Sequence, residues 1–276
     1  MDAARTNLTS TNCDIHEGRL VGSGSFRDVV EGTYVGGNRN NQAAVCKTFK
    51  PKFCHLEDEY YAMDFKVTDK AIQFANEWNE FCPAGKEILI NRGNIHCIGG
   101  QRYLIEPFIR DFEKYTSNSG TIIKHHGKGR AAQTWAMEAF SHFTYHRSGG
   151  SLLICDLQGR YKKAKFANQK SRFELTDLAC CSRKRSFGPT DLAEKGIESF
   201  FANHVCNTFC HQTGRWSRPK NPIQWFADST GTSMLSSKES YKLDLANPTK
   251  FKTTLGQLVE EDEDEESGEE DEYYNF

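Results

Sequence analysis

Residues 152–159 read Leu-Leu-Ile-Cys-Asp-Leu-Gln-Gly. The apolar run predicts a buried strand that ends in a carboxylate at Asp156, and Gln158 adds an amide oxygen at the same turn. A second carboxylate, Asp177, follows in residues 174–177, which read Glu-Leu-Thr-Asp. Phosphoryl transfer needs a carboxylate near the attacking hydroxyl and hard oxygen ligands for Mg²⁺. These three side chains supply such groups, although each alone is more often a turn residue than a catalyst.

A lysine inside an apolar run is the second chemical signal. Lys47 lies within residues 43–49, and burying an ammonium group without an anionic partner is expensive. Upstream, residues 22–27 read Gly-Ser-Gly-Ser-Phe-Arg and could form a turn that approaches a phosphate. The glycine run alone is weak evidence, because glycine-rich hairpin turns are common. A glycine turn followed by a lysine in the next strand and then a hinge at Pro107 is the order of a kinase-type nucleotide cleft.

The apolar spacing along the chain predicts a strand-rich first half and a mixed second half. Helices are expected at residues 64–81, 133–144 and 192–209, because apolar side chains recur there at helical spacing. Residues 20–35 read as two strands joined by a turn, and further strands are expected at 87–90 and 103–108. Residues 161–172 are basic without periodicity and are predicted to form a loop.

Three soft metal ligands are concentrated in residues 204–210, which read His-Val-Cys-Asn-Thr-Phe-Cys. On a helix, Cys206 and Cys210 would face the same way, with His204 near the same end. Tetrahedral Zn²⁺ needs a fourth ligand, and the spacing leaves open which histidine supplies it. The candidates are His142, His125, His126, His146 and His211. The alternative is two core cysteines and a surface histidine.

Several motifs, taken in order, resemble the alpha-kinase family. These are the atypical protein kinases typified by myosin heavy-chain kinase, elongation-factor-two kinase and the channel-kinases. The motifs in the second half are residues 139–145, 152–159, 175–177, 187–201 and 204–210. Those in the first half are residues 24–29, 45–47, 105–109 and 118–120. The resemblance covers roughly residues 15 to 215, and the ordered series is more specific than any single piece.

The resemblance implies an α+β, two-lobed, protein-kinase-like fold. The expected divisions are an N-lobe at residues 1–106, a C-lobe at 107–216, an irregular extension at 217–259 and a disordered acidic tail at 260–276. By the same resemblance, Asp156 is the catalytic aspartate, and Gln158 and Asp177 hold magnesium. The implied ATP-binding residues are Lys47, Arg27, Gly24 and Glu106, with Glu106 at the hinge facing the adenine. The implied structural zinc site is His142, His204, Cys206 and Cys210.

The function implied is transfer of the ATP γ-phosphoryl group to a Ser or Thr hydroxyl of a protein substrate, with ATP, Mg²⁺ and structural Zn²⁺ bound. Three positions depart from the family pattern. Leu178 replaces a proline, and Asp191 and Ala193 replace an asparagine and a glycine. These departures leave one rival open, a nucleotide-binding pseudokinase scaffold. A second rival is a zinc-stabilised nucleic-acid-binding module, which is suggested by the positive charge outside the acidic tail and by the interleaved lysines and aromatic residues of 161–173. The survival of Lys47 and Asp156 favours the active enzyme.

The charge of the chain is divided unevenly. The formal net charge is −2, from 35 basic and 37 acidic residues. Residues 260–272 hold eleven carboxylates, which leaves the remainder at about +9. We interpret the tail as a solubilising segment, or alternatively as a polyanion that folds back onto the basic cleft. Without a signal-like N-terminus or a long apolar run, the sequence predicts an intracellular, cytoplasmic protein with no membrane partner. A nucleic-acid partner is disfavoured, because the basic segment at 161–173 contains no recognition motif.

Overall fold

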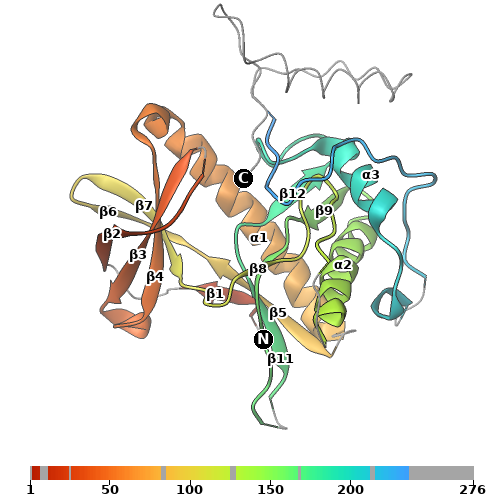
Figure 1. Ribbon diagram of the computed structural model, residues 1–276, viewed down its shortest axis with the longest axis horizontal. Helices are drawn as coiled ribbons and strands as arrows, with labels where there is room; N and C mark the ends of the chain where they lie inside the picture. Colours follow the sequence, from red (N-terminus) through yellow and green to blue (C-terminus); the bar gives the residue numbers. More distant parts are fainter. Residues whose placement is uncertain are drawn as a thin grey trace, which may run out of the picture. The chain divides into compact units, whose positions relative to one another are not determined.

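The chain forms two compact units. The computed structural model describes residues 2–6, 12–24, 26–81, 85–124, 129–166, 169–211 and 215–235. The first unit comprises Met1–Glu113 and Leu157–Leu178, and the second comprises Lys114–Asp156 and Ala179–Phe276. Strand β8 (Glu113–Lys114) lies where the chain passes from the first unit to the second. Figure 1 shows the elements of both units, coloured along the sequence.

An antiparallel sheet of the first unit carries Lys47 on its middle strand. The order is β2 (Asn12–Ser23), β3 (Arg27–Val35), β4 (Ala43–Phe49), β7 (Gln101–Pro107) and β6 (Asn94–Ile98). Lys47 pairs in register with Val29 on β3 and Leu104 on β7. Side chains alternate along a strand, so Ala44 and Cys46 enter one apolar cluster while Phe49 enters another. Lys47 therefore occupies a strand that is packed on both faces.

Helix α1 (Glu57–Phe81) is the long helix of the first unit and begins seven residues before the predicted start. Its buried positions follow helical spacing, and three acidic residues stand in its first turn, where they favour the helix dipole. Short 3₁₀ turns precede it: η1 (Gly37–Arg39) and η2 (Pro51–Leu56). Asn79 exchanges two hydrogen bonds of 2.8 Å with the backbone of Ile88 and so ties the helix to β5. None of the described helices is long and apolar enough to cross a membrane.

A second sheet of the first unit corrects the loop expected at residues 161–172. Its neighbouring strands are β1 (Ala4–Thr6), β5 (Lys86–Arg92), β11 (Ser171–Leu175) and β10 (Gln158–Lys162). β10 and β11 pair as an antiparallel hairpin, and β11 runs parallel to β5. The prediction was wrong for both ends of this segment, because polar side chains on one face hid the strand pattern.

One buried carboxylate, Glu174, binds the arginine side chains on the polar face of this sheet. Glu174 is 1% exposed and accepts hydrogen bonds from Arg160 at 2.7 Å and Arg172 at 3.0 Å. Arg5 on β1 adds an ion pair at 3.4 Å. Burial opposes ionisation of Glu174, but the three guanidinium groups outweigh it and lower its pKa. The arginines therefore contribute to joining β1, β10 and β11, although their sequence resembles a solvated loop.

The second unit packs helices against a two-stranded sheet. It contains α2 (Arg130–Arg147), β9 (Leu152–Cys155), β12 (Ala179–Ser182), α3 (Ala193–Asn203) and the short η3 (Thr208–His211). β9 and β12 are antiparallel, and Leu153 and Cys155 join α3 in one apolar core with Trp225 and Phe226. The expected strand at 151–156 and helix at 133–144 correspond to β9 and α2. The expected helix at 192–209 ends early, because His204 adopts extended backbone angles.

The compact units are divided differently from the continuous lobes expected at 1–106 and 107–216. Residues 157–178 belong to the first unit because β11 pairs with β5, although they follow α2 in the chain. The polar region after 217 includes a buried stretch up to Leu235. The acidic tail at 260–276 lies outside the described residues. Its expected disorder therefore stays a prediction.

Two of the departures from the family pattern, Asp191 and Ala193, lie together where α3 begins. Asp191 is fully buried and accepts hydrogen bonds from the backbone of Ser182, Phe187 and Ala193 at 2.8, 3.1 and 2.9 Å. Burial raises the pKa of Asp191, and these hydrogen bonds oppose the increase. Ala193 has a φ of 55°, in the left-handed region where a Cβ atom is strained. The loop is thus stabilised by Asp191 while it holds an alanine in a conformation that favours glycine.

Ala193→Gly is expected to stabilise the protein. Relief of the left-handed strain exceeds the added freedom of the unfolded chain, so the gain is about 0.5–1 kcal/mol. Denaturant unfolding monitored by circular dichroism measures it. The matched control is Ala202→Gly, at an exposed position of α3 with no such strain, which should lose about 0.5–1 kcal/mol. A loss of stability in both variants would contradict the assigned strain.

Candidate active site and metal centre

A buried ammonium group forms the centre of the candidate site in the first unit. Lys47 is 4% exposed, and its Nζ lies 3.1 Å from Oε1 of Glu106 on β7. The same Nζ pairs with Oδ1 of Asp177, whose side chain is half exposed. Burial alone would lower the pKa of Lys47, but the two carboxylates outweigh it and raise the pKa. Lys47 therefore remains cationic, as a phosphate-binding lysine must.

The second oxygen of Glu106 is also engaged. Thr176 Oγ1 donates a hydrogen bond to Glu106 Oε2. Burial raises the pKa of Glu106, and Lys47 partly offsets this effect. The carboxylate is thus anchored by a lysine on β4 and a threonine that follows β11. This geometry orients Glu106 toward Lys47, a role that the sequence did not suggest for a hinge residue.

Gln158 and Asp177, the two predicted magnesium ligands, lie together. Gln158 Nε2 donates a hydrogen bond of 2.7 Å to the backbone oxygen of Asp177. Asp177 has a φ of 51°, so its side chain projects from a tight left-handed turn. Gly159 has a φ of 147°, and a Cβ atom there would lie 2.0 Å from the Glu174 backbone oxygen. The glycine of this motif is therefore required by the close approach of β11 to β10.

Arg27 lies at the start of β3, beside the glycine turn. Its Nη1 lies 2.6 Å from Asp64 Oδ2, and its guanidinium group stands 4.3 Å above the Phe49 ring. Within the described residues, its buried Nε and Nη2 atoms have no hydrogen-bond partner. Gly24 donates from its backbone to the Arg27 oxygen at 2.8 Å, which closes the turn. The guanidinium group therefore pairs with Asp64 through Nη1 and has two further nitrogens with which it could bind an anion.

Asp156 is the last residue of its segment in the second unit, and it is completely buried. Its φ of 57° places it in the left-handed region, directly after β9. Lys114 Nζ lies 2.8 Å from Oδ1, and Thr232 Oγ1 donates a hydrogen bond of 2.5 Å to Oδ2. Both partners are distant from Asp156 in sequence. The carboxylate is therefore held by an ammonium group and a hydroxyl group that no sequence motif near Asp156 predicts.

The four predicted zinc ligands converge in the second unit. The ligand atoms of His142, His204, Cys206 and Cys210 all lie within 4.8 Å of one another. His204 Nε2 is 3.2 Å from His142 Nδ1, and the two sulfurs lie 3.6–3.7 Å from these imidazole nitrogens. Two imidazoles and two thiols in this arrangement match a closed tetrahedral zinc site. The ligands come from α2, from the extended segment after α3 and from η3.

The outward nitrogen of each imidazole has its own partner. His204 Nδ1 lies 2.9 Å from Glu138 Oε2, and His142 Nε2 lies 3.0 Å from the Ser217 backbone oxygen. Burial and the neighbouring His204 lower the pKa of His142 to about 3, so its imidazole is neutral. A hydrogen bond at the outer nitrogen fixes the orientation of each ring and leaves its inner nitrogen directed into the cluster. The donor set therefore fits Zn²⁺ by chemistry as well as by distance.

The structure also tests the alternative fourth ligands. His146 forms a hydrogen bond with Ser217 and is not part of the cluster. His125 and His126 lie outside the described residues, as does the side chain of His211. The sequence missed Thr176, Lys114, Thr232 and Glu138. Thr176 stands next to Asp177 and so was visible in its motif, whereas Lys114 and Thr232 gave no signal because only folding brings them to Asp156.

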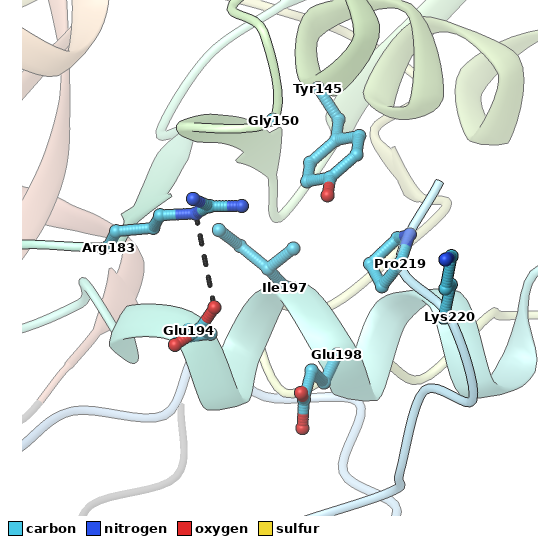
Figure 2. Close-up of a pocket in the computed structure, with 8 residues that line it drawn as sticks. All are labelled: Tyr145, Gly150, Arg183, Glu194, Ile197, Glu198, Pro219 and Lys220. Atoms are coloured by element: carbon cyan, nitrogen blue, oxygen red, sulfur yellow. Dashed lines mark ion pairs between the residues drawn. The ribbon is translucent and has the colours of Figure 1, made fainter. Parts of the chain in front are cut away.

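A separate cavity of about 220 Å³ lies in the second unit, and Figure 2 shows the residues that line it. Tyr145 and Ile197 supply apolar surface, and Arg183 pairs with Glu194 at 3.9 Å. The remaining lining residues are Gly150, Glu198, Pro219 and Lys220. None of the predicted site residues is among these. The cavity is therefore distinct from both the Asp156 cluster and the metal-ligand cluster.

The family can be assigned from the sequence as well as from this geometry. The sequence model of the alpha-kinase family matches residues 22–210 of this chain. The chain belongs to the alpha-kinase family. Eukaryotic elongation factor 2 kinase of Caenorhabditis elegans is 25% identical over 221 residues, which cover 77% of this chain and 26% of that protein. Alpha-protein kinase vwkA of Dictyostelium discoideum is 26% identical over 183 residues, covering 66% of this chain and 26% of the relative. The chain thus spans about a quarter of the length of these alpha-kinases.

Solved structures confirm the alpha-kinase fold. The inactive alpha-kinase domain of myosin heavy chain kinase A (D766A), in complex with ATP, superposes with a TM-score of 0.58 at 20% identity. The match covers 74% of this chain and 89% of that domain. The predicted α+β fold of the alpha-kinase type is therefore confirmed.

Proposed function

We propose that the chain is an ATP-dependent protein serine/threonine kinase of the alpha-kinase type. The observation that carries the proposal is the buried Lys47, held by Glu106 and Asp177 within one unit. A cationic lysine oriented by a carboxylate is the arrangement with which protein kinases bind nucleotide phosphates. The ATP complex of a myosin heavy chain kinase A domain supports ATP as the phosphoryl donor.

Each predicted site residue of the first unit has a defined role in the proposed mechanism. Lys47 pairs with the phosphates of ATP, and Arg27 offers its unpaired nitrogens to the same anion. Gly24 shapes the turn that presents Arg27, and Glu106 holds Lys47. The placement of Glu106 beside the adenine stays a prediction. Gln158 and Asp177 would hold Mg²⁺ through an amide and a carboxylate oxygen. When bound, that ion neutralises charge on the phosphates.

Asp156 acts on the acceptor. We assign it the positioning of a Ser or Thr hydroxyl. Its Oδ2 would receive the hydroxyl proton as the hydroxyl oxygen bonds to the γ-phosphorus of ATP, while the bond from that phosphorus to the β–γ bridging oxygen breaks and ADP leaves. Lys114 stabilises the ionised carboxylate at Oδ1, which keeps Oδ2 able to accept a hydrogen bond. The acceptor protein and its specificity stay open. Substrate residues that engage the loop before α3 would meet Asp191 and Ala193 rather than the asparagine and glycine of the family pattern.

A pseudokinase is the second candidate, and one observation favours it. Asp156 is completely buried, and its two oxygens are contacted by Lys114 and Thr232. An external hydroxyl would have to displace Thr232 to reach the carboxylate. The nucleic-acid module is supported less, because Arg172 binds Glu174 and Lys170 lies 3.4 Å from Glu87. These ion pairs reduce the positive charge that the basic segment could offer to nucleic-acid phosphates.

Lys47→Met tests the kinase activity. The change keeps an unbranched side chain, one atom shorter, and removes the charge, so transfer from Mg-ATP to a basic protein should fall by at least ~10²-fold. Radiolabel incorporation measures the rate, and circular dichroism verifies the fold. Lys66→Ala, on the exposed face of α1, is the control and should retain activity. A wild-type protein that binds ATP and transfers no phosphate would establish the pseudokinase instead.

We also propose that His142, His204, Cys206 and Cys210 hold one structural Zn²⁺. Elemental analysis of the purified chain should give one zinc per chain. Cys210→Ser should lose the metal and several kcal/mol of stability, since metal binding contributes directly to folding. Cys97→Ser, an exposed cysteine outside the cluster, is the control and should keep both. Protein that is fully folded without metal, with an unchanged melting temperature after chelation, would refute the site.

The acidic tail and the cellular location are proposed on sequence alone. Residues 260–272 would act as a solubilising polyanion, with association to the basic surface of the body as the alternative. An intracellular, cytoplasmic location remains the expectation for such a kinase.

A further inference from the structure

The β10–β11 hairpin of the first unit concentrates positive charge. Residues 160–172 hold six basic residues and no acidic residue. Arg160 and Arg172 bind the buried Glu174 and so take part in holding the sheet together. Three of the four lysines are exposed and pair with no carboxylate in the described part of the chain: Lys162, Lys163 and Lys165. The fold therefore leaves their charge available to a partner.

These lysines lie on a part of the hairpin that extends beyond its sheet. β11 begins at Ser171, which pairs with Lys86, the first residue of β5. Residues 163–166 and 169–170 therefore lie beyond the start of β5, where Figure 1 shows the hairpin extending away from the other strands. The backbone nitrogen of Ala164 donates a hydrogen bond of 3.0 Å to Ser171 Oγ, which keeps the two arms of the hairpin together. The lysines are thus carried on two hydrogen-bonded arms outside the sheet.

An exposed aromatic ring stands at the end of the same hairpin. The backbone nitrogen of Gln169 donates a hydrogen bond of 3.0 Å to the Phe166 oxygen, so Phe166 lies where the chain reverses direction between the two arms. Phe166 is 65% exposed, with Lys165 on one arm and Lys170 on the other. A single exposed apolar residue is common on protein surfaces and needs no explanation by itself. An apolar residue at the end of a projecting hairpin, with lysines behind it, matches the membrane interface, where acyl chains meet charged head groups.

The arrangement favours a lipid surface over a nucleic acid. Proteins that bind single-stranded nucleic acids without sequence preference use several aromatic rings, on which successive bases stack. The other aromatic residue of 160–172 is Tyr161, which packs against the buried Phe173 with ring centroids 5.1 Å apart. Phe166 is therefore the one exposed ring that accompanies the lysines within the described part of this hairpin.

We propose that the end of the β10–β11 hairpin binds an anionic lipid surface. Phe166 enters the boundary between head groups and acyl chains, and Lys162, Lys163 and Lys165 lie against the anionic head groups. The whole chain carries a net charge of −2, so the attraction is local to the hairpin rather than a property of the total charge. The expectation of no membrane partner rested on the lack of a spanning segment, which a peripheral contact does not need. The contact requires no nucleotide and is independent of the proposed kinase function.

Co-sedimentation of the full chain with lipid vesicles tests the contact. Wild type should bind vesicles of phosphatidylcholine and phosphatidylserine at about 0.1 M salt, and at least ~10-fold more weakly at about 1 M salt, where charges are screened within about 3 Å. Vesicles of phosphatidylcholine alone should bind little. Lys163→Glu with Lys165→Glu should weaken binding by at least ~25-fold, because each lysine near an anionic surface raises affinity about fivefold. Phe166→Ser should weaken it about 10-fold and Phe166→Leu should keep it, because burial of the apolar side chain supplies that part of the affinity.

Lys52→Glu with Lys66→Glu is the matched control, since it makes the same change of charge at two exposed lysines elsewhere in the first unit. This variant should bind as wild type does, and circular dichroism verifies the fold of every variant. An equal loss in the control would overturn the proposal, because binding would then follow total charge.

Three further outcomes would overturn the lipid contact. The first is wild-type protein that does not bind the phosphatidylserine vesicles. The second is equal binding of wild type and Phe166→Ser, which would exclude insertion of the ring. The third is salt-sensitive binding of single-stranded RNA through Lys163 and Lys165 without binding to vesicles, which would support the nucleic-acid module in its place.

Discussion

The ammonium group of Lys47 is the constraint on which the first unit depends. An unpaired charge in a strand packed on both faces would cost several kcal/mol, so carboxylates must meet it there. Glu106 comes from the neighbouring strand β7, whereas Asp177 comes from residues 157–178, far along the chain. The pairing of β11 with β5, supported by Glu174 and its arginines, brings that segment back. A charge requirement and a strand pairing thus assemble the candidate nucleotide site together.

The motif at residues 156–159 contains the point where the chain passes from the second unit to the first. Asp156 ends a segment of the second unit, and Leu157 begins a segment of the first. The aspartate is fixed by Lys114 and Thr232, while Gln158 two positions later is bound to Asp177. The roles proposed for Asp156 and Gln158 therefore fall on residues that are two positions apart in the sequence. The motif combines a left-handed aspartate with a glycine whose Cβ atom would collide with the Glu174 backbone oxygen.

The sequence predicted much of this arrangement, and its failures have physical causes. Periodicity identified α1, α2 and β9. The ligand types at residues 204–210 indicated a metal cluster, and the resemblance to alpha-kinases supplied His142 as its fourth member. The β10–β11 hairpin was missed because Arg160 and Arg172 form ion pairs with Glu174, which removes the apolar alternation of a strand. The helix at 192–209 was overextended because His204 turns to extended geometry. Thr232 and Lys114 were beyond prediction, since only folding places them at Asp156.

The most direct test is a crystal structure with Mg²⁺ and a non-hydrolysable ATP analogue. The account predicts that Lys47 Nζ lies within hydrogen-bonding distance of a phosphate oxygen and keeps its contact with Glu106. It also predicts that the metal is held by Gln158 and Asp177. A nucleotide bound elsewhere, with Lys47 still paired only to Glu106 and Asp177, would contradict the central claim that this buried lysine is a phosphate-binding residue.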